Sequence, residues 1–157
     1  MPEERTKRRA AKDKAKGKAP STQAGEFVRE EIDHVREGNH GARSTKQAIA
    51  IGLSKARRAG VALPPPKAGS TSKRTRQSAA RDSARGRAEP TRKPSPRRSR
   101  ATRKALEREP RAAATTTALS RQAHASARRR GPAARKAAAR KAAQTRARRS
   151  SAAKHKH

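Results

Sequence analysis

The chain has 157 residues, of which 44 are Lys or Arg and 12 are Asp or Glu, so its formal net charge is +32. Its hydrophobic fraction is 30 %, most of it alanine, and the chain has one Phe, no Trp, no Tyr and no Cys. This composition excludes a large apolar core, a disulfide framework and any thiolate site. We therefore expect a mostly disordered chain in which one short all-α helical hairpin is flanked by basic low-complexity arms.

The first segment, residues 1–20, is predicted to be a basic disordered arm with 8 basic and 3 acidic side chains. No apolar stretch follows these charges, which excludes a secretory signal peptide. The longest mainly apolar run, Ala48 to Leu53, is far shorter than the roughly 20 residues that cross a bilayer. We expect a soluble cytoplasmic protein with no membrane partner.

The second segment, residues 21–63, is nearly neutral, with 7 basic and 5 acidic side chains, and holds Phe27 together with every Ile and Val of the chain. Its apolar residues between Ala24 and Val35 follow a helical spacing, which predicts a helix over Glu26–Glu37. The turn sequence at Gly38–Gly41 ends this helix. The hairpin is expected over about residues 24–63, and its predicted core is Phe27, Val28, Ile32, Val35, Ile49 and Leu53.

The second helix of the hairpin has a clear start signal. Ser44 with Gln47 three residues later forms a capping box, in which each side chain satisfies a free backbone N–H at the other residue. Gly60 ends the helix, and the prolines from Pro64 onward prevent its continuation. Gly52 would let the two helices approach closely.

A hairpin of about forty residues is marginal alone. We expect self-association, docking on a protein partner, or partial folding. The acidic side chains of the first helix could neutralise basic ones of the second, within one chain or between two. These groups are Glu30, Glu31, Asp33 and Glu37 on the first helix and Lys46, Lys55, Arg57 and Arg58 on the second.

The amino terminus of the second helix, with His40 and Arg43 just before it, could instead bind a phosphate. A helix-turn-helix reader of DNA would look broadly similar. The ordinary interpretation is a capped helix with solvated charges, and we favour it.

The third segment, residues 64–157, is predicted to be a disordered tail rich in Ala, Arg, Pro and Ser, with 29 basic and 4 acidic side chains. Alanine favours helix, but arginines all around a helix repel one another. Residues 132–149 could therefore become helical only when phosphates remove that repulsion. Such a tail binds nucleic-acid phosphates strongly and without sequence information.

Two short motifs in the tail resemble DNA-binding sequences. Ser95-Pro96-Arg97-Arg98 resembles the Ser-Pro-basic-basic motif of linker-histone tails, in which a turn presents paired cations. Arg85-Gly86-Arg87 resembles the centre of an AT-hook, without its flanking prolines. The candidate nucleic-acid-binding residues are Arg85, Arg87, Lys93, Arg97, Arg98, Arg100, Arg128, Arg129, Arg130, Arg135, Lys136, Arg140, Lys141, Arg146, Arg148 and Arg149.

Catalytic, cofactor and metal sites are not expected. The five histidines are scattered, no paired carboxylates lie in an apolar segment, and no glycine-rich phosphate loop is present. His34 beside Glu30, Glu31 or Glu37 could ligate a metal, but a histidine beside acids on a helix is far more often a surface group.

The block Glu26 to Val61 resembles a small bacterial domain family of unknown function, whose members are short basic proteins with an Ala/Lys/Arg-rich tail. The resemblance implies a bacterial origin, and so cytoplasm and nucleoid, but it carries no activity and no functional residue. The likeness of the tail to linker histones is one of composition.

Together these features predict a non-enzymatic protein that binds and compacts duplex DNA without sequence specificity, as a nucleoid-associated, histone-like protein does. One alternative is an RNA-binding or ribosome-associated basic protein. Lack of aromatic side chains, on which single strands stack, disfavours RNA. The other alternative is a protein–protein adaptor whose tail only anchors it to polyanions.

Overall fold

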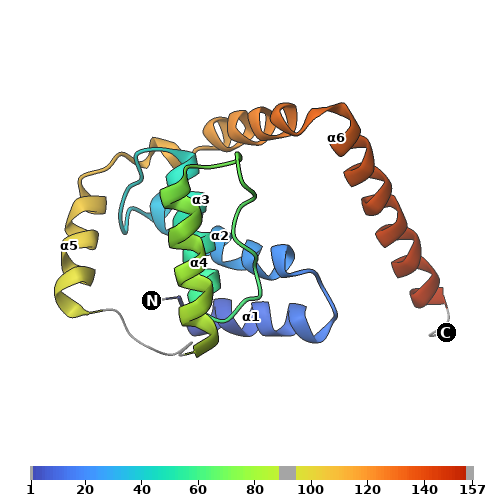
Figure 1. Cartoon of the computed structure of the whole chain (residues 1–157), viewed down its shortest axis with the longest axis horizontal. Helices are drawn as coiled ribbons and strands as arrows, with labels where there is room; N and C mark the ends of the chain where they lie inside the picture. Colours follow the sequence, from blue (N-terminus) through green and yellow to red (C-terminus); the bar gives the residue numbers. More distant parts are fainter. Residues whose placement is uncertain (1, 89–94, 155–157) are drawn as a thin grey trace. The chain divides into compact units, whose positions relative to one another are not determined.

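A computed structural model describes residues 2–88 and 95–154 of the chain. In this part the regular elements are all helices: α1 (Glu4–Ala15), α2 (Pro20–Glu37), α3 (Thr45–Arg58), α4 (Lys73–Ala88), α5 (Pro96–Glu107), the 3-10 helix η1 (Arg111–Ala114) and α6 (Thr116–Lys154) (Figure 1). The prediction of a mostly disordered chain is therefore wrong, and so is its description as intrinsically disordered. The fold class is all-α.

The two helices expected between residues 24 and 63 are present as α2 and α3, which pack against each other. The first begins earlier than predicted, with Pro20 in its first turn, where a missing backbone N–H costs nothing. It ends at Gly38, which has a left-handed φ of 82°. Ser44 caps α3 by accepting the Gln47 backbone N–H at 3.2 Å, while the Gln47 side chain accepts the Arg43 N–H at 2.8 Å, one residue earlier than the capping box predicts.

Gly52 brings α2 and α3 into close contact. A Cβ at this position would lie 2.6 Å from the Val28 Cα and 3.0 Å from the Phe27 carbonyl oxygen. Neither backbone atom can move without shifting α2, so the crossing requires glycine. The close approach expected from the sequence is confirmed.

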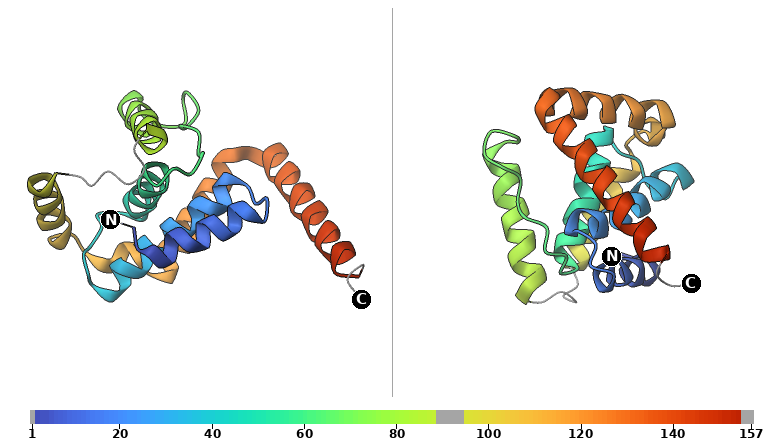
Figure 2. Two further views of the ribbon diagram at one scale, coloured as in Figure 1. Left: turned by 90° about the horizontal axis from the view of Figure 1, so that it is seen from below. Right: turned by 90° about the vertical axis from the view of Figure 1, so that its right-hand side faces the viewer.

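The basic arm at residues 1–20 is not disordered but folds as α1 and packs along α2 (Figure 2). Ala10 is buried in the core with Ala24 and Phe27 of α2. At the start of α1 the Glu3 backbone N–H donates to Glu30 at 3.0 Å, and Arg9 pairs with Glu26 at 2.9 Å. This helix was missed because its buried face, Thr6, Ala10 and Asp13, is too polar to show an apolar period.

The beginning of the tail also folds onto the hairpin, since α4 packs along α3 (Figure 1). Ala79, Ser83 and Gly86 are buried at this contact. The chain between α3 and α4 folds back against the hairpin, with Val61 buried in the core and Leu63 packed beside it.

Small residues explain how so little apolar mass makes a core. In the described part of the chain, eight of the twelve buried apolar residues are alanines: Ala10, Ala24, Ala42, Ala48, Ala56, Ala79, Ala113 and Ala114. Alanine and glycine let helices approach closely, so a small total volume fills the interior. Of the predicted core residues, Phe27, Ile32 and Val35 are buried, whereas Val28, Ile49 and Leu53 are half-buried.

The chain divides into two compact units, residues 1–118 and 119–157. The second consists of the greater part of α6, which is interrupted at Gly131 (φ 77°, ψ 168°) before Pro132. Proline disfavours the helical conformation in the residue before it, so the helix breaks there. None of the described helices is long and apolar enough to cross a membrane.

Candidate nucleic-acid interface

Helix α4 carries a row of cations on the side opposite its contact with α3. The buried residues Ala79, Ser83 and Gly86 lie on one face. Arg74, Arg81 and Arg85 are exposed, and their spacing of seven and four residues puts them on the other face. This arginine stripe is about 16 Å long at ~1.5 Å per residue.

The contact of α4 with α3 fixes the direction of that stripe. Ser83 donates a hydrogen bond to the Leu63 carbonyl at 3.2 Å, and Ser54 of α3 donates to Asp82 at 2.5 Å. Gly86 lies directly against the backbone carbonyl of Arg57, where a Cβ would collide. The segment Arg85-Gly86-Arg87 is thus helical, and its glycine packs against α3 instead of lying extended as in an AT-hook.

Helix α5 begins at the Ser-Pro motif. Ser95 is the N-cap, its hydroxyl accepts the Arg98 backbone N–H at 3.4 Å, and Pro96 occupies the first turn. The motif therefore starts a helix in place of the isolated turn expected from the sequence. The exposed cations Arg97 and Arg100 lie on one face of α5, and Lys104 continues the row one turn further.

Helix α6 is the most cationic element of the molecule. Between Thr116 and Lys154 the sequence has twelve Lys or Arg residues and no acidic residue. Beyond Pro132 the cations do not form a single stripe, because their spacings distribute them around the helix axis. The side chains of residues 132–148 are exposed.

The sequence-predicted binding residues fall on all three of these helices. Arg85 and Arg87 are exposed on α4, and Arg97, Arg98 and Arg100 are exposed on α5. The exposed members on α6 are Arg128, Arg129, Arg130, Arg135, Lys136, Arg140, Lys141, Arg146 and Arg148. Arg149 continues the α6 backbone, and Lys93 lies outside the described residues. Sequence reasoning missed Arg74, Arg81 and Lys104, although their helical spacing was visible.

Several cations of the bundle α1–α3 have carboxylate partners, which is rarer among the cations of the tail. Lys18 pairs with Asp13 at 2.5 Å, and Lys55 pairs with Glu31 at 2.7 Å and with Glu30 at 3.2 Å. Among the described residues of α4, α5 and α6, Arg103 is the basic side chain that forms an ion pair, with Glu107 at 2.9 Å. Most of the net positive charge therefore lies after residue 72, and α1 adds exposed cations such as Arg5 and Arg8 that form no ion pair within the described part of the chain.

The pairing of Lys55 with Glu30 and Glu31 shows that acidic side chains of α2 neutralise a basic side chain of α3 within one chain. The other basic residues of α3 behave differently. Arg58 faces Asp82 of α4 at 3.9 Å. Arg57 is buried, its guanidinium donates to the Pro64 carbonyl at 3.2 Å, and burial lowers its pKa.

Side chains at the amino terminus of α3 have hydrogen-bond partners within the chain. Ser44 already accepts the Gln47 N–H, and Thr45 is buried and donates to the Ala113 carbonyl of η1 at 2.6 Å. His40 interacts with Gly41 and Glu31. The interpretation as an ordinary capped helix is therefore confirmed.

Residues 13–67 match the model of a family of unknown function (DUF6496). The match spans about a third of the chain, from the end of α1 through α3. It confirms the predicted similarity to a domain family of unknown function, and it says nothing about the linker-histone-like tail. No curated protein and no solved structure matched the chain.

Proposed function

We propose that this chain is a non-enzymatic nucleic-acid-binding protein that coats duplex DNA through its phosphates, using the exposed cations of α4, α5 and α6. The observation that carries the proposal is α6, whose 39 residues, interrupted at Gly131, include twelve basic and no acidic ones. In this account α1–α3 form the scaffold, in which part of the charge is paired internally.

The shape of α6 suits a duplex groove. A helix is about 10–12 Å in diameter, and the major groove of B-DNA is about 12 Å wide with phosphates along both walls. The exposed cations beyond Pro132 lie all around the helix, so both walls can be contacted together. Residues 132–154 span roughly 33 Å at ~1.5 Å per residue, a length of duplex that carries about twenty phosphate charges.

Two features favour duplex over single-stranded ligands. The only aromatic side chain outside histidine, Phe27, is 1 % exposed and belongs to the core. Base stacking, which dominates single-strand binding, therefore has no aromatic platform here. Arginine is also the more common cation in α6, and its planar fork suits phosphate oxygens.

The proposal also covers where the protein lies in the cell and what its binding does to DNA. A protein that coats duplex DNA in a bacterium would lie on the nucleoid in the cytoplasm, and neutralising phosphates favours compaction. Linker-histone tails have a similar composition, which supports this likeness. Self-association through α2 and α3 stays a prediction, but its original reason is weaker because α1, α4 and η1 cover the hairpin within one chain.

The test is a competition experiment with the full-length protein freed of nucleic acid. A fluorescent 24-base-pair DNA duplex would be displaced by unlabelled duplex DNA, duplex RNA or single-stranded DNA at several salt concentrations. We expect duplex DNA to compete best and affinity to fall steeply and log-linearly with salt. Preferential displacement by duplex RNA would favour the RNA-binding alternative, and weak, salt-insensitive binding to all three would favour the adaptor.

A further inference from the structure

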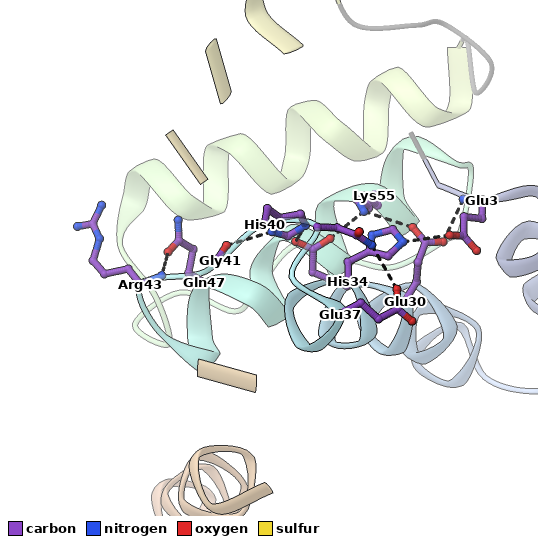
Figure 3. Close-up of polar contacts among 11 residues, drawn as sticks. Glu3, Glu30, His34, Glu37, His40, Gly41, Arg43, Gln47 and Lys55 are labelled. Carbon is purple, nitrogen blue, oxygen red and sulfur yellow. Dashed lines mark hydrogen bonds and ion pairs between the residues drawn. The ribbon is translucent and has the colours of Figure 1, made fainter. Parts of the chain in front are cut away.

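A second cluster of functional side chains lies within the bundle, away from the cationic helices. Glu31 and His34 lie one turn apart on α2, and His40 follows in the loop before α3 (Figure 3 labels the two histidines). One potential ligand atom of each residue lies within 4.8 Å of those of the other two. The two imidazole rings meet edge to face with centroids 6.2 Å apart.

In each histidine, one ring nitrogen makes a hydrogen bond that sets the tautomer. His40 Nδ1 lies 3.0 Å from the Gly41 carbonyl oxygen, which only accepts, so Nδ1 carries the hydrogen. His34 Nε2 lies 3.0 Å from a Glu3 carboxylate oxygen, and this hydrogen bond lowers the pKa of Glu3. In the neutral rings the lone pairs are then on His40 Nε2 and His34 Nδ1. In metal sites, a ligating histidine is oriented in the same way, by a hydrogen bond from the ring nitrogen that does not bind the metal.

Glu31 is fully buried, and its Oε1 has no hydrogen-bond donor. The Lys55 ammonium approaches the other oxygen, Oε2, at 2.7 Å and so holds the carboxylate in place. Oε1 instead faces His40 Nε2 at 3.4 Å. With a neutral His40, two lone pairs face each other at this contact, and a proton or a metal ion between them would make it favourable.

The cavity beside this cluster is lined by charges of both signs. The Lys55 ammonium pairs with Glu30 and Glu31, and the Glu30 carboxylate also accepts the Glu3 backbone N–H. Figure 3 labels Lys55, Glu30 and Glu3. Arg58, Arg98 and Arg103 line the same cavity; Arg58 faces Asp82 of α4, and Arg103 pairs with Glu107.

We propose that Glu31, His34 and His40 form a binding site for a divalent transition-metal ion of the zinc type. Two imidazole nitrogens and one carboxylate oxygen suit Zn²⁺ and Co²⁺, whereas Mg²⁺ and Ca²⁺ prefer oxygen ligands alone. The three residues border an open cavity of about 490 Å³, through which water can reach the ion as a further ligand. Lys55 and Glu3 position the ligands.

The ion would attach the loop between α2 and α3 to the body of α2. That loop also holds the segment that leads to α6, because the Gly41 N–H donates to the Leu106 carbonyl at 2.9 Å and the Ala42 N–H donates to the Pro110 carbonyl at 3.0 Å. Metal binding would therefore stabilise the region where the basic tail leaves the bundle.

Isothermal titration of full-length, metal-free and nucleic-acid-free protein with Zn²⁺ tests the proposal. Every protein in this experiment also carries H155A and H157A, because His155 and His157 could bind metal by themselves. We expect one Zn²⁺ per chain, with at least tenfold weaker binding in H34A and in H40A. The matched control is H124A, which removes an exposed histidine of α6 and should not change the affinity. Equal affinity for H40A and H124A would overturn the site.

A second measurement keeps all three ligands in place, so it tests the site even if H34A or H40A fails to fold. Co²⁺ added to the H155A/H157A protein should give the strong visible absorption of a four- or five-coordinate ion, and Zn²⁺ should displace it. The weak spectrum of hydrated, six-coordinate Co²⁺ would contradict the proposal. Glu3→Gln leaves all three ligands in place and should weaken Zn²⁺ binding about 10-fold or more, as loss of such a hydrogen-bond partner does; unchanged affinity would overturn the role of Glu3.

Discussion

At the scale of single residues, Gly52 decides how closely α2 and α3 pack. Gly52→Ala would place a methyl group 2.6 Å from the Val28 Cα, and we expect a loss of about 1–3 kcal/mol in the free energy of unfolding from overpacking. Gly25→Ala on α2 is the matched control, because a Cβ there meets nothing within 4 Å. Since alanine is the better helix former, this control should stabilise the protein by up to ~1 kcal/mol. Urea denaturation followed by circular dichroism measures both, and equal effects would contradict the close crossing.

Lys55 is the residue whose loss should cost the bundle most. Its ammonium lies between Glu30 and Glu31, whose side chains are 2 % and 0 % exposed. Lys55→Met leaves two buried carboxylates without their cation, which typically costs about 3–5 kcal/mol.

The control for this prediction is Lys46→Gln, an exposed position on the same helix, which should change stability by less than ~0.5 kcal/mol. Chemical denaturation of both variants gives the comparison. If the two variants unfold at the same urea concentration, the buried ion triad does not stabilise the fold.

At the scale of elements, the sequence predicts well those helices that bury apolar side chains. Phe27, Ile32 and Val35 revealed α2, and Ser44 with Gln47 marked the start of α3. By contrast, α1 and α4 are buried through Ala10, Ala79 and Gly86, and alanine or glycine contacts produce no hydrophobic period.

The candidate metal site shows a similar division. Glu31 and His34 are three residues apart on α2, and that spacing was visible in the sequence. The position of His40 beside them depends on the left-handed turn at Gly38 and on the path of the loop, which local patterns do not specify. Three-dimensional proximity was therefore needed to recognise the cluster.

The helical form of α6 leads to a test that separates a binding helix from a disordered polycation. Ala138→Pro breaks the helix in its middle at a cost of about 3 kcal/mol and leaves the charge unchanged. If α6 binds DNA as a helix, this variant should lose helical circular dichroism and bind duplex DNA more weakly.

The matched control is Ala138→Ser, which keeps the charge and remains compatible with a helix. Affinities from fluorescence anisotropy at one salt concentration suffice. Equal DNA affinity for the proline variant, the serine variant and the wild type would mean that charge alone, and not the helix, determines binding.

At the scale of the whole molecule, charge and fold are distributed unequally along the chain. Acidic residues of α1 and α2 pair with some of the cations of the bundle, and most of the excess of basic residues follows on α4, α5 and α6. The same sequence thus encodes a small all-α scaffold and a set of exposed cationic helices. Composition predicted the excess charge correctly but not its helical presentation.

The most direct test of the central claim compares two variants with equal loss of charge. R135Q/K136Q/R140Q/K141Q removes four exposed cations of α6, and R5Q/R8Q/K12Q/K14Q removes four exposed cations of α1. The measurement is the slope of log affinity for duplex DNA against log salt. We predict that the α6 variant reduces the slope by about 3–4, since each phosphate contact contributes ~0.9, while the α1 variant changes it little. Equal reductions would mean that only net charge matters, and a larger loss in the α1 variant would place the interface on the bundle.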